Sequence, residues 1–198
     1  MNTIFRWQII SEDVVTEYEG YDDYIYTFVW KYIGENGSYS SFLSGTTTFV
    51  NPSETFIPFV DVTEQDKISW LEQYNNVSLM QNQINIDLYN QQYTNTYRWY
   101  ILELETMPEF QGHQDFVTKV LYRYNVVNNL GYSADIQGQL TFNEVPNPYV
   151  EYANITEADV ITWLDTYTDK QQLQDNLTLN LIQQMNPAIV SLPLPWEQ

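Results

Sequence analysis

The chain repeats itself, and this internal duplication is the feature that most restricts how it can fold. The segment 5–9 (FRWQI) returns 92 positions later as segment 97–101 (YRWYI), and Lys31-Tyr32 returns at the same offset as Arg123-Tyr124. The segment 63–71 (TEQDKISWL) returns 93 positions later as segment 156–164 (TEADVITWL). Similar segments in the same order and at nearly constant spacing indicate a tandem repeat. We therefore predict two homologous modules, residues 1–92 and 93–186, followed by a proline-rich tail, residues 187–198. The change of offset predicts one extra residue in module two, between positions 124 and 132.

The first half of each module has the pattern of an antiparallel sheet. In module one, residues 4–10 and 24–33 alternate side chains on two faces, and the second run is rich in β-branched and aromatic residues, as in strands. Asn36-Gly37 predicts a tight hairpin, after which the chain returns through residues 38–43. We expect a bend near Gly45 before a further strand over residues 46–50. The prediction is a meander of about four strands, with an acidic loop over residues 12–23.

The second half of each module has the pattern of two helices. Thr63 and Thr156 stand where an N-cap belongs, with Asp66 and Asp159 three residues later, as in a capping box. The second helix of each module repeats apolar residues every fourth position, which places them on one stripe. These residues are Met80, Ile84 and Leu88 in module one and Leu173, Leu177 and Leu181 in module two. The predicted fold class is α+β: two tandem modules, each a sheet with two helices packed on it.

The charge of the chain excludes two classes of partner. With 26 Asp and Glu against 7 Lys and Arg, the formal net charge is −19. Such a protein repels nucleic-acid backbones and anionic membrane surfaces. No apolar run reaches the roughly 18 residues of a membrane span, and the start of the chain does not resemble a signal peptide. We expect a protein that stays in the cytoplasm where it is made and that binds neither nucleic acid nor membrane.

Few residue types suited to catalysis are present. The chain has no cysteine and a single histidine, His113, which is expected in an exposed loop because no Gly-x-Ser-x-Gly motif accompanies it. The segment 12–23 holds six carboxylates, but its spacing is not that of a calcium-binding EF-hand, and a solvated loop is the favoured interpretation. We predict no catalytic residue, no metal ion and no cofactor, and therefore not an enzyme. A carboxylate pair for glycoside hydrolysis is a third-ranked alternative.

The aromatic content points to contacts with other proteins. The chain has 17 Tyr and 6 Trp, residues that anchor both cores and interfaces. Tyr24, Tyr26 and Trp30 share one face of the long strand and are candidate partner contacts. Stacking on sugars is the alternative, which would make the protein a glycan-binding adhesin.

The tail is a further candidate contact. Residues 187–198 contain three prolines among apolar residues and have no counterpart in module one. Proline favours an extended path. Two interpretations stay open. The tail either packs back on the helices or reaches a neighbouring subunit, with Pro195 and Trp196 as the contact.

Several of these short motifs together resemble a small uncharacterised protein family of tailed bacteriophages. The motifs are Thr47-Thr48-Phe49, Phe56-Ile57-Pro58, Thr63-Glu64-Gln65-Asp66, Trp70, Thr156-Glu157-Ala158-Asp159, Trp163 and Pro195-Trp196. The chain departs from the family pattern in being doubled and in lacking Phe-Ile-Pro in its second copy. The resemblance implies a phage protein that is part of the virion, and it implies no enzymatic activity.

The hypothesis that follows is that the chain is a non-enzymatic structural protein of the virion of a phage. The favoured position is the capsid surface, where it would act as a decoration or stabilising protein. Its partners would be the major capsid protein or tail and neck proteins, and it would also be able to form a homo-oligomer. Two similar modules offer two similar contact surfaces to a lattice. A position on the tail or neck is the close alternative.

Overall fold

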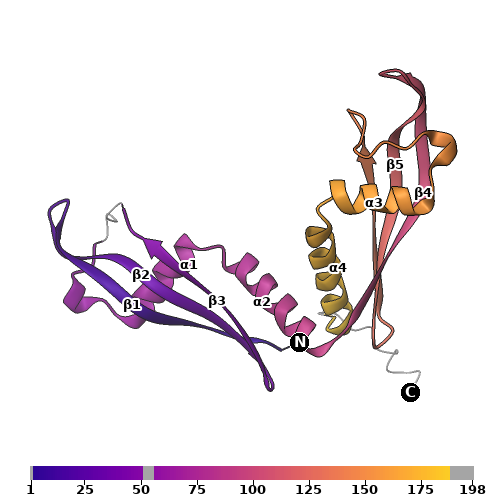
Figure 1. Cartoon of the computed structure of the whole chain (residues 1–198). Helices are drawn as coiled ribbons and strands as arrows, with labels where there is room; N and C mark the ends of the chain where they lie inside the picture. The colour runs from indigo at the N-terminus through magenta and orange to yellow at the C-terminus, as the bar shows by residue number, and fades with distance from the viewer. Residues whose placement is uncertain (1, 51–55, 188–198) are drawn as a thin grey trace, which may run out of the picture. The chain divides into compact units, whose positions relative to one another are not determined.

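The computed structural model describes residues 2–50 and 56–187, and the chain divides into two compact units, Met1–Gln92 and Tyr93–Gln198. Each unit is a three-stranded antiparallel sheet followed by a short 3-10 helix and two α-helices (Figure 1). Module one comprises β1 (Ile4–Tyr18), β2 (Tyr21–Asn36), β3 (Tyr39–Thr48), the 3-10 helix Phe59–Asp61, α1 (Glu64–Tyr74) and α2 (Val77–Gln92). Module two comprises β4 (Asn95–Phe110), β5 (His113–Asn128), β6 (Ser133–Thr141), the 3-10 helix Tyr152–Asn154, α3 (Glu157–Tyr167) and α4 (Lys170–Met185). The α+β class and the tandem arrangement are as predicted from the sequence.

Each module has three strands rather than the predicted four, because the strands are longer than the sequence pattern indicates. The acidic segment 12–23 is not a loop: β1 runs through it to Tyr18, and β2 begins at Tyr21. Two register shifts mark β-bulges: Ile10 is the extra residue in β1, between Ile9 and Ser11, and Tyr26 is the extra residue in β2, opposite Asp13 and Val14. A bulge adds a residue to one strand and shifts the alternation of its side chains. Beyond Ile9, the alternation of apolar and polar residues along β1 therefore no longer follows the same phase, although the strand continues.

A two-residue turn joins the first two strands of each module at equivalent places. The φ angles of Glu19 and Gly20 are 49° and 89°, and those of Gln111 and Gly112 are 49° and 88°. Positive φ at both central residues defines the type I′ turn, whose twist matches that of a hairpin. Glycine at the second position adopts this conformation without strain. The acidic residues of the segment thus stand on a long two-stranded hairpin.

The predicted bend near Gly45 is also absent, because β3 is continuous through that residue. A Cβ atom on Gly45 would lie 2.6 Å from Cζ2 of Trp30, the residue paired with it on β2. In module two, Gly138 lies under Tyr122 in the same way, with a Cβ-to-hydroxyl distance of 2.5 Å. In both modules glycine makes room for a large ring lying over the strand, and it does not turn the chain.

The extra residue of module two lies where the change of offset predicts it. The turn between β2 and β3 has two residues, whereas four residues separate β5 from β6; because β6 has 9 residues and β3 has 10, the net gain is one residue. The Asn128 side chain closes this longer turn: its Oδ1 accepts hydrogen bonds from the backbone N–H groups of Leu130 and Tyr132, both at 3.0 Å. Local side-chain bonds of this kind stabilise turns that have no strand partner.

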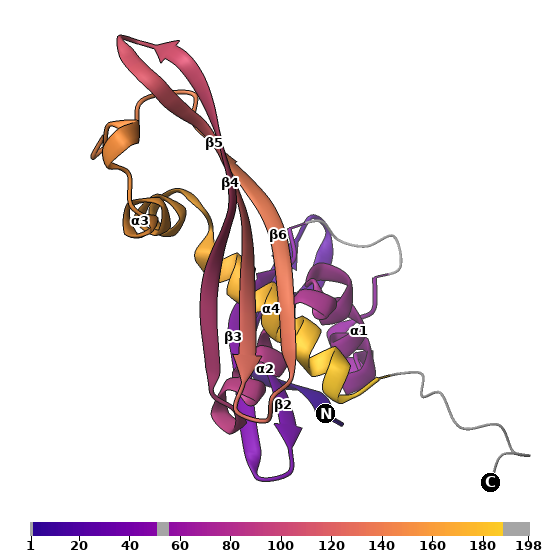
Figure 2. The same ribbon diagram turned by 90° about the vertical axis from the view of Figure 1, so that its right-hand side faces the viewer.

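Both helices of a module pack on the same face of its sheet (Figures 1 and 2). The predicted capping boxes are present: Asp66 N–H donates to Thr63 Oγ1 at 3.2 Å, and Asp159 N–H donates to Thr156 Oγ1 at 3.3 Å. Tyr32 and its equivalent Tyr124 point toward the second helix and accept hydrogen bonds from Gln81 and Gln174. The cores lie between this face and the helices. Their fully buried members are Phe28, Leu71, Ile84 and Leu88 in module one and Phe116, Val120, Tyr124, Val126, Leu164, Leu177 and Leu181 in module two.

Replacing Gly45 by alanine tests the packing of a ring over the glycine. The added methyl group would overlap the Trp30 indole, so we expect Gly45→Ala to lower the free energy of unfolding by about 1–3 kcal/mol, the usual cost of overpacking a core. Ser44→Ala, at the adjacent exposed position, is the matched control, with an expected change below about 0.5 kcal/mol. Urea unfolding followed by tryptophan fluorescence measures both. Equal stability of the two variants would contradict this interpretation.

Candidate functional site

The aromatic residues predicted to contact a partner lie on the face of the sheet that the helices cover. Tyr24 and Trp30 are each 7% exposed, and Tyr26 is half-buried. Trp30 Nε1 donates a hydrogen bond to Thr47 Oγ1 at 2.8 Å, and the Tyr24 hydroxyl donates to the carbonyl of Phe49 at 3.2 Å. Tyr24 and Trp30 thus lie in the core of module one with their polar atoms bonded there, whereas Tyr26, whose ring lies 5.6 Å from that of Tyr18, stays a predicted contact. Pro195 and Trp196 lie outside the described residues.

The other sequence candidates are spread over module two and the hairpins. His113 begins β5, where its ring lies 4.0 Å from that of Tyr149 and its Nδ1 lies 3.9 Å from Glu151. Within residues 2–50 and 56–187, no group of three or more His, Cys, Asp or Glu side chains is arranged to hold a metal ion. In the same ranges, no helix has both the length and the apolar composition that crossing a bilayer requires.

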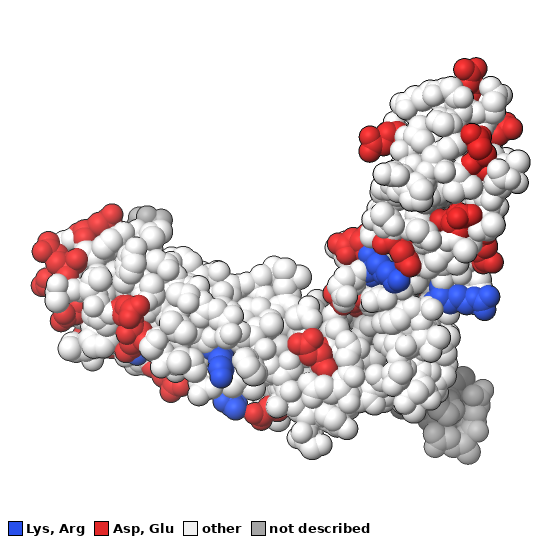
Figure 3. Space-filling view, viewed as in Figure 1, with Lys and Arg blue, Asp and Glu red and all other residues white. Residues whose placement is uncertain are grey.

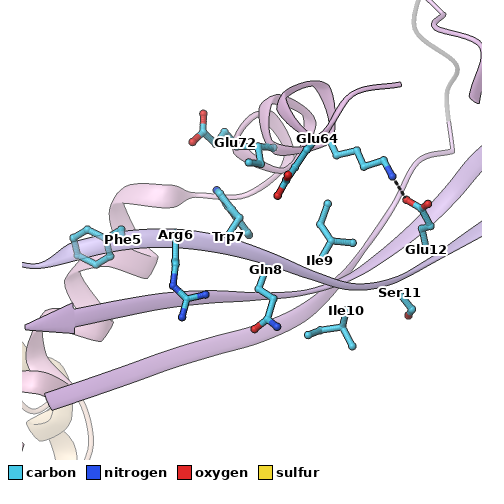
Figure 4. Close-up of a pocket in the computed structure, with 12 residues that line it drawn as sticks. Phe5, Arg6, Trp7, Gln8, Ile9, Ile10, Ser11, Glu12, Glu64 and Glu72 are labelled. Carbon is cyan, nitrogen blue, oxygen red and sulfur yellow. Dashed lines mark hydrogen bonds and ion pairs between the residues drawn. The ribbon is translucent and has the colours of Figure 1, made fainter. Parts of the chain in front are cut away.

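A groove of about 1040 Å³ lies between β1 and α1 in module one (Figure 4). We call it the β1–α1 groove. Its residues come from one continuous stretch of strand and one side of a helix: Phe5, Arg6, Trp7, Gln8, Ile9, Ile10, Ser11 and Glu12 from β1, and Glu64, Lys67, Ile68 and Glu72 from α1. Lys67 Nζ pairs with Glu12 across the groove at 2.5 Å, whereas Glu64 and Glu72 are exposed on the helix. The groove therefore has an apolar and aromatic floor and a rim with more acidic than basic groups.

One polar atom of the groove is enclosed without a hydrogen bond. Trp7 Nε1 is shielded from solvent and has no partner among the described residues. Its ring packs against Trp30 and Tyr32, with centroid distances of 5.2 and 4.6 Å. A buried donor that lacks an acceptor costs about 1–3 kcal/mol. Such a donor in a groove is therefore a place where a ligand with an acceptor gains binding energy.

In module two, the equivalent tryptophan N–H group has a hydrogen-bond acceptor within the module. Trp99, the equivalent of Trp7, donates from Nε1 to Asp165 Oδ1 at 2.9 Å, and Asp165 also pairs with Lys170 Nζ at 2.7 Å. Burial raises the pKa of Asp165, but the bonds from Lys170 and Trp99 outweigh it and hold that pKa below its ordinary value. The same ion pair raises the pKa of Lys170. At the equivalent positions, module one has Glu72 and Val77.

The face of each sheet that the helices leave open, the outer face, carries basic residues at equivalent positions. In module one these are Arg6 and Lys31, and in module two they are Arg98 and Arg123. Each face also has a ring against a cation: Lys31 Nζ lies 4.6 Å from the Phe42 centroid. In module two, Tyr100 lies between Arg98 and Arg123, at 5.0 and 4.6 Å.

Acidic residues gather elsewhere, at the hairpin end of each module (Figure 3). They include Glu17, Glu19, Asp22 and Asp23 in module one and Glu103, Glu105, Glu109 and Asp115 in module two. Acidic residues thus predominate at the hairpin end, whereas the outer face carries basic side chains, of which Arg6 pairs with Glu35 at 2.9 Å. Sequence reasoning missed this surface, although the repetition of Arg6 as Arg98 and of Lys31 as Arg123 was its signal.

Comparison with known proteins identifies both halves of the chain as copies of one domain. A family model described as a domain of unknown function (DUF7936) matches residues 2–96 and again residues 94–196. The two matches support the tandem duplication inferred from the repeat. Neither a search of curated proteins nor a search of solved structures gave a significant match.

The ion pair of module two predicts a pH dependence. A carboxyl group with a lowered pKa stabilises the fold above its unfolded-state pKa, and this contribution is lost as pH falls through its folded-state pKa. We expect Asp165→Asn to lower the free energy of unfolding by about 1 kcal/mol at pH 7, a value set by the partial exposure of the pair. We expect the variant and the unchanged protein to converge in strongly acidic solution. Glu72→Gln in module one is the control, with little change at either pH. Thermal unfolding across the acidic range measures both, and a constant difference at all pH values would contradict the prediction.

Proposed function

The chain belongs in both its halves to the DUF7936 family, and from this repetition we propose that it is a non-enzymatic structural protein of a bacteriophage particle, which binds neighbouring proteins through the outer faces of its two modules. On this proposal it is attached to the outside of the capsid. The observation that carries the binding role is the equivalent placement of Arg6 with Arg98 and of Lys31 with Arg123 on those faces.

The outer faces have the properties of a protein contact surface. They combine cations, aromatic rings and apolar side chains; Phe42 is 54% exposed and packs against Lys31. Arginine and aromatic residues are enriched where proteins bind one another. In a chain with only 7 basic residues, the retention of two of them at equivalent positions in each module favours a shared contact with acidic or polar partners. Two such faces on one chain suit neighbouring subunits of a lattice.

The placement on a phage particle rests on the resemblance of the sequence motifs, in particular Thr47-Thr48-Phe49 and Thr63-Glu64-Gln65-Asp66, to proteins of tailed phages. The net charge of −19 supports an external position, because an acidic protein is repelled by packaged DNA. A position on the tail or neck uses the same faces and is the nearest alternative.

The glycan-binding alternative receives less support from the side chains. Stacking on a sugar requires an open ring face. All five tryptophans in the described part of the chain are buried or half-buried, namely Trp7, Trp30, Trp70, Trp99 and Trp163, so exposed tyrosines such as Tyr74 and Tyr167 would have to supply it. The exposed cation-and-ring pairs of the outer faces favour a protein partner instead.

Purified particles of the phage that encodes the chain test the proposal directly. We expect mass spectrometry of intact, nuclease-treated particles to find the chain in fixed ratio to the major capsid protein. Particles that lack the chain would contradict the proposal. Labelled antibody on intact particles then separates the positions, since binding to capsids supports the capsid surface and binding confined to tails supports the alternative.

A single charge removed from an outer face tests the contact surface. Arg98 is exposed, so Arg98→Gln leaves the fold intact while removing a contact, and we expect the particle-bound fraction to fall severalfold. Glu157→Gln, which removes one exposed charge from the helix side of module two, is the matched control and should leave binding unchanged. Equal retention of both variants on particles would rule out the outer face of module two as the contact.

A further inference from the structure

We propose that the β1–α1 groove of module one binds an extended, basic peptide segment of a partner protein, which adds to the free edge of β1. The site follows the edge of β1 and shares Arg6 with the outer face of module one, and the inference holds whether or not the protein is part of a phage particle. The partner is defined by its chemistry: a strand-like segment with Lys or Arg side chains and a free hydrogen-bond acceptor.

The shape of the groove follows a strand edge. Within its sheet, β1 pairs with β2 alone, so the backbone groups along its other edge have no strand partner in that sheet. Eight consecutive residues of β1, from Phe5 to Glu12, line the groove. Successive strand residues point to opposite faces, so only a groove along the edge contacts all of them. Exposed edges of this kind bind extended peptides by adding a strand.

The bulge in β1 sets the length of that pairing. The regular register of β1 is interrupted between Ile9 and Ser11, and a bulge ends regular pairing along an edge. The usable edge therefore runs from Ile4 to Ile9, which accommodates a segment of about six residues or roughly 20 Å of extended chain.

The polar groups of the groove define what the segment must carry. Trp7 Nε1 is enclosed and has no partner among the described residues, so it requires an acceptor such as a backbone carbonyl. Glu64 and Glu72 project from α1 at the rim (Figure 4), whereas Lys67 is already paired with Glu12. Arg6, the other cation of the lining, pairs with Glu35 of β2 at 2.9 Å, so the charges of the lining that have no ion-pair partner are negative. A segment with Lys or Arg complements them, and the net charge of −19 attracts such a segment from a distance.

In module two, side chains of the module itself take the place that the proposed segment takes in module one. There Asp165 supplies the acceptor for Trp99, and Lys170 supplies the cation beside the acidic residue. Module one has lost both groups: Glu72 replaces Asp165 without reaching Trp7, and Val77 replaces Lys170. The pair that closes the site in module two is the pair that a bound segment would bring to module one.

Peptide binding to the full chain tests the proposal. The probe is an array of seven-residue peptides with Lys at alternate positions and Val, Thr, Tyr or Leu between them, matched by an array with Glu in place of Lys. The strongest binder is then titrated against the full chain by fluorescence anisotropy. We expect lysine peptides to bind in preference to glutamate peptides, with one peptide per chain.

Two double variants decide where the peptide binds. Glu72→Asp with Val77→Lys installs the closure of module two in module one, and we expect the affinity to fall at least tenfold. Asp165→Glu with Lys170→Val opens the site of module two, and we expect two peptides per chain. Thermal unfolding confirms that each variant is folded before titration. If the second variant unfolds, the first variant and Trp7→Phe, which removes the N–H group together with the pyrrole ring of the indole, still decide the question.

Three results would overturn the proposal. The first is an array in which lysine peptides bind no better than glutamate peptides, and the second is an affinity that Glu72→Asp with Val77→Lys leaves unchanged. The third comes from the indole N–H resonances of the full chain in NMR, where the Trp7 signal is identified by its loss in Trp7→Phe. If Glu72→Gln shifts that signal in the free protein as strongly as Asp165→Gln shifts the Trp99 signal, Trp7 is already bonded within the module and requires no partner.

Discussion

The packing of large rings against one face of a small sheet is the interaction on which each module depends. Three strands bury little surface unless one face is filled with bulky side chains, and a module of about 90 residues is near the lower limit for a stable core. Trp7, Trp30 and Tyr32 supply this surface in module one, and their equivalents Trp99, Tyr122 and Tyr124 supply it in module two. The glycines under Trp30 and Tyr122 follow from the same need, because the rings lie flat over the neighbouring strand. With one face committed to the core, the other is left for contacts outside the module.

The sequence alone predicts the parts of this structure that depend on local pattern or on repetition. A sequence pattern alone predicts the duplication, the capping boxes of α1 and α3 and the extra residue near Asn128. It does not predict the strand after Ile9, because a bulge moves the alternation out of phase while hydrogen bonding continues. Alternation also does not show which face of β2 the helices cover. For this reason Trp30 is predicted as a contact from the sequence, although it lies in the core. The β1–α1 groove depends on the spacing of a helix from a strand, which no residue pattern encodes.

The two modules share a fold but differ at the residues that surround equivalent tryptophans. In module two, Asp165 links Trp99 to Lys170 and ties α3 to β4. In module one, Lys67 and Glu12 form the link between helix and strand instead, further along β1. Duplication allows such divergence, because one copy can maintain a shared contact surface while the other changes. The outer faces have kept their basic residues through this divergence, whereas the surroundings of the two tryptophans have not.

The separation of the two sheets has a consequence for how the chain is made. Strands β1 to β3 pair only with one another, and they precede every residue of module two. Module one can therefore complete its hydrogen bonding on a translating ribosome before the first strand of its twin emerges from the exit tunnel. This order matters for a chain with two similar halves, because nascent strands of like sequence are prone to exchange partners. Vectorial synthesis removes that hazard by closing the first sheet before a competitor exists.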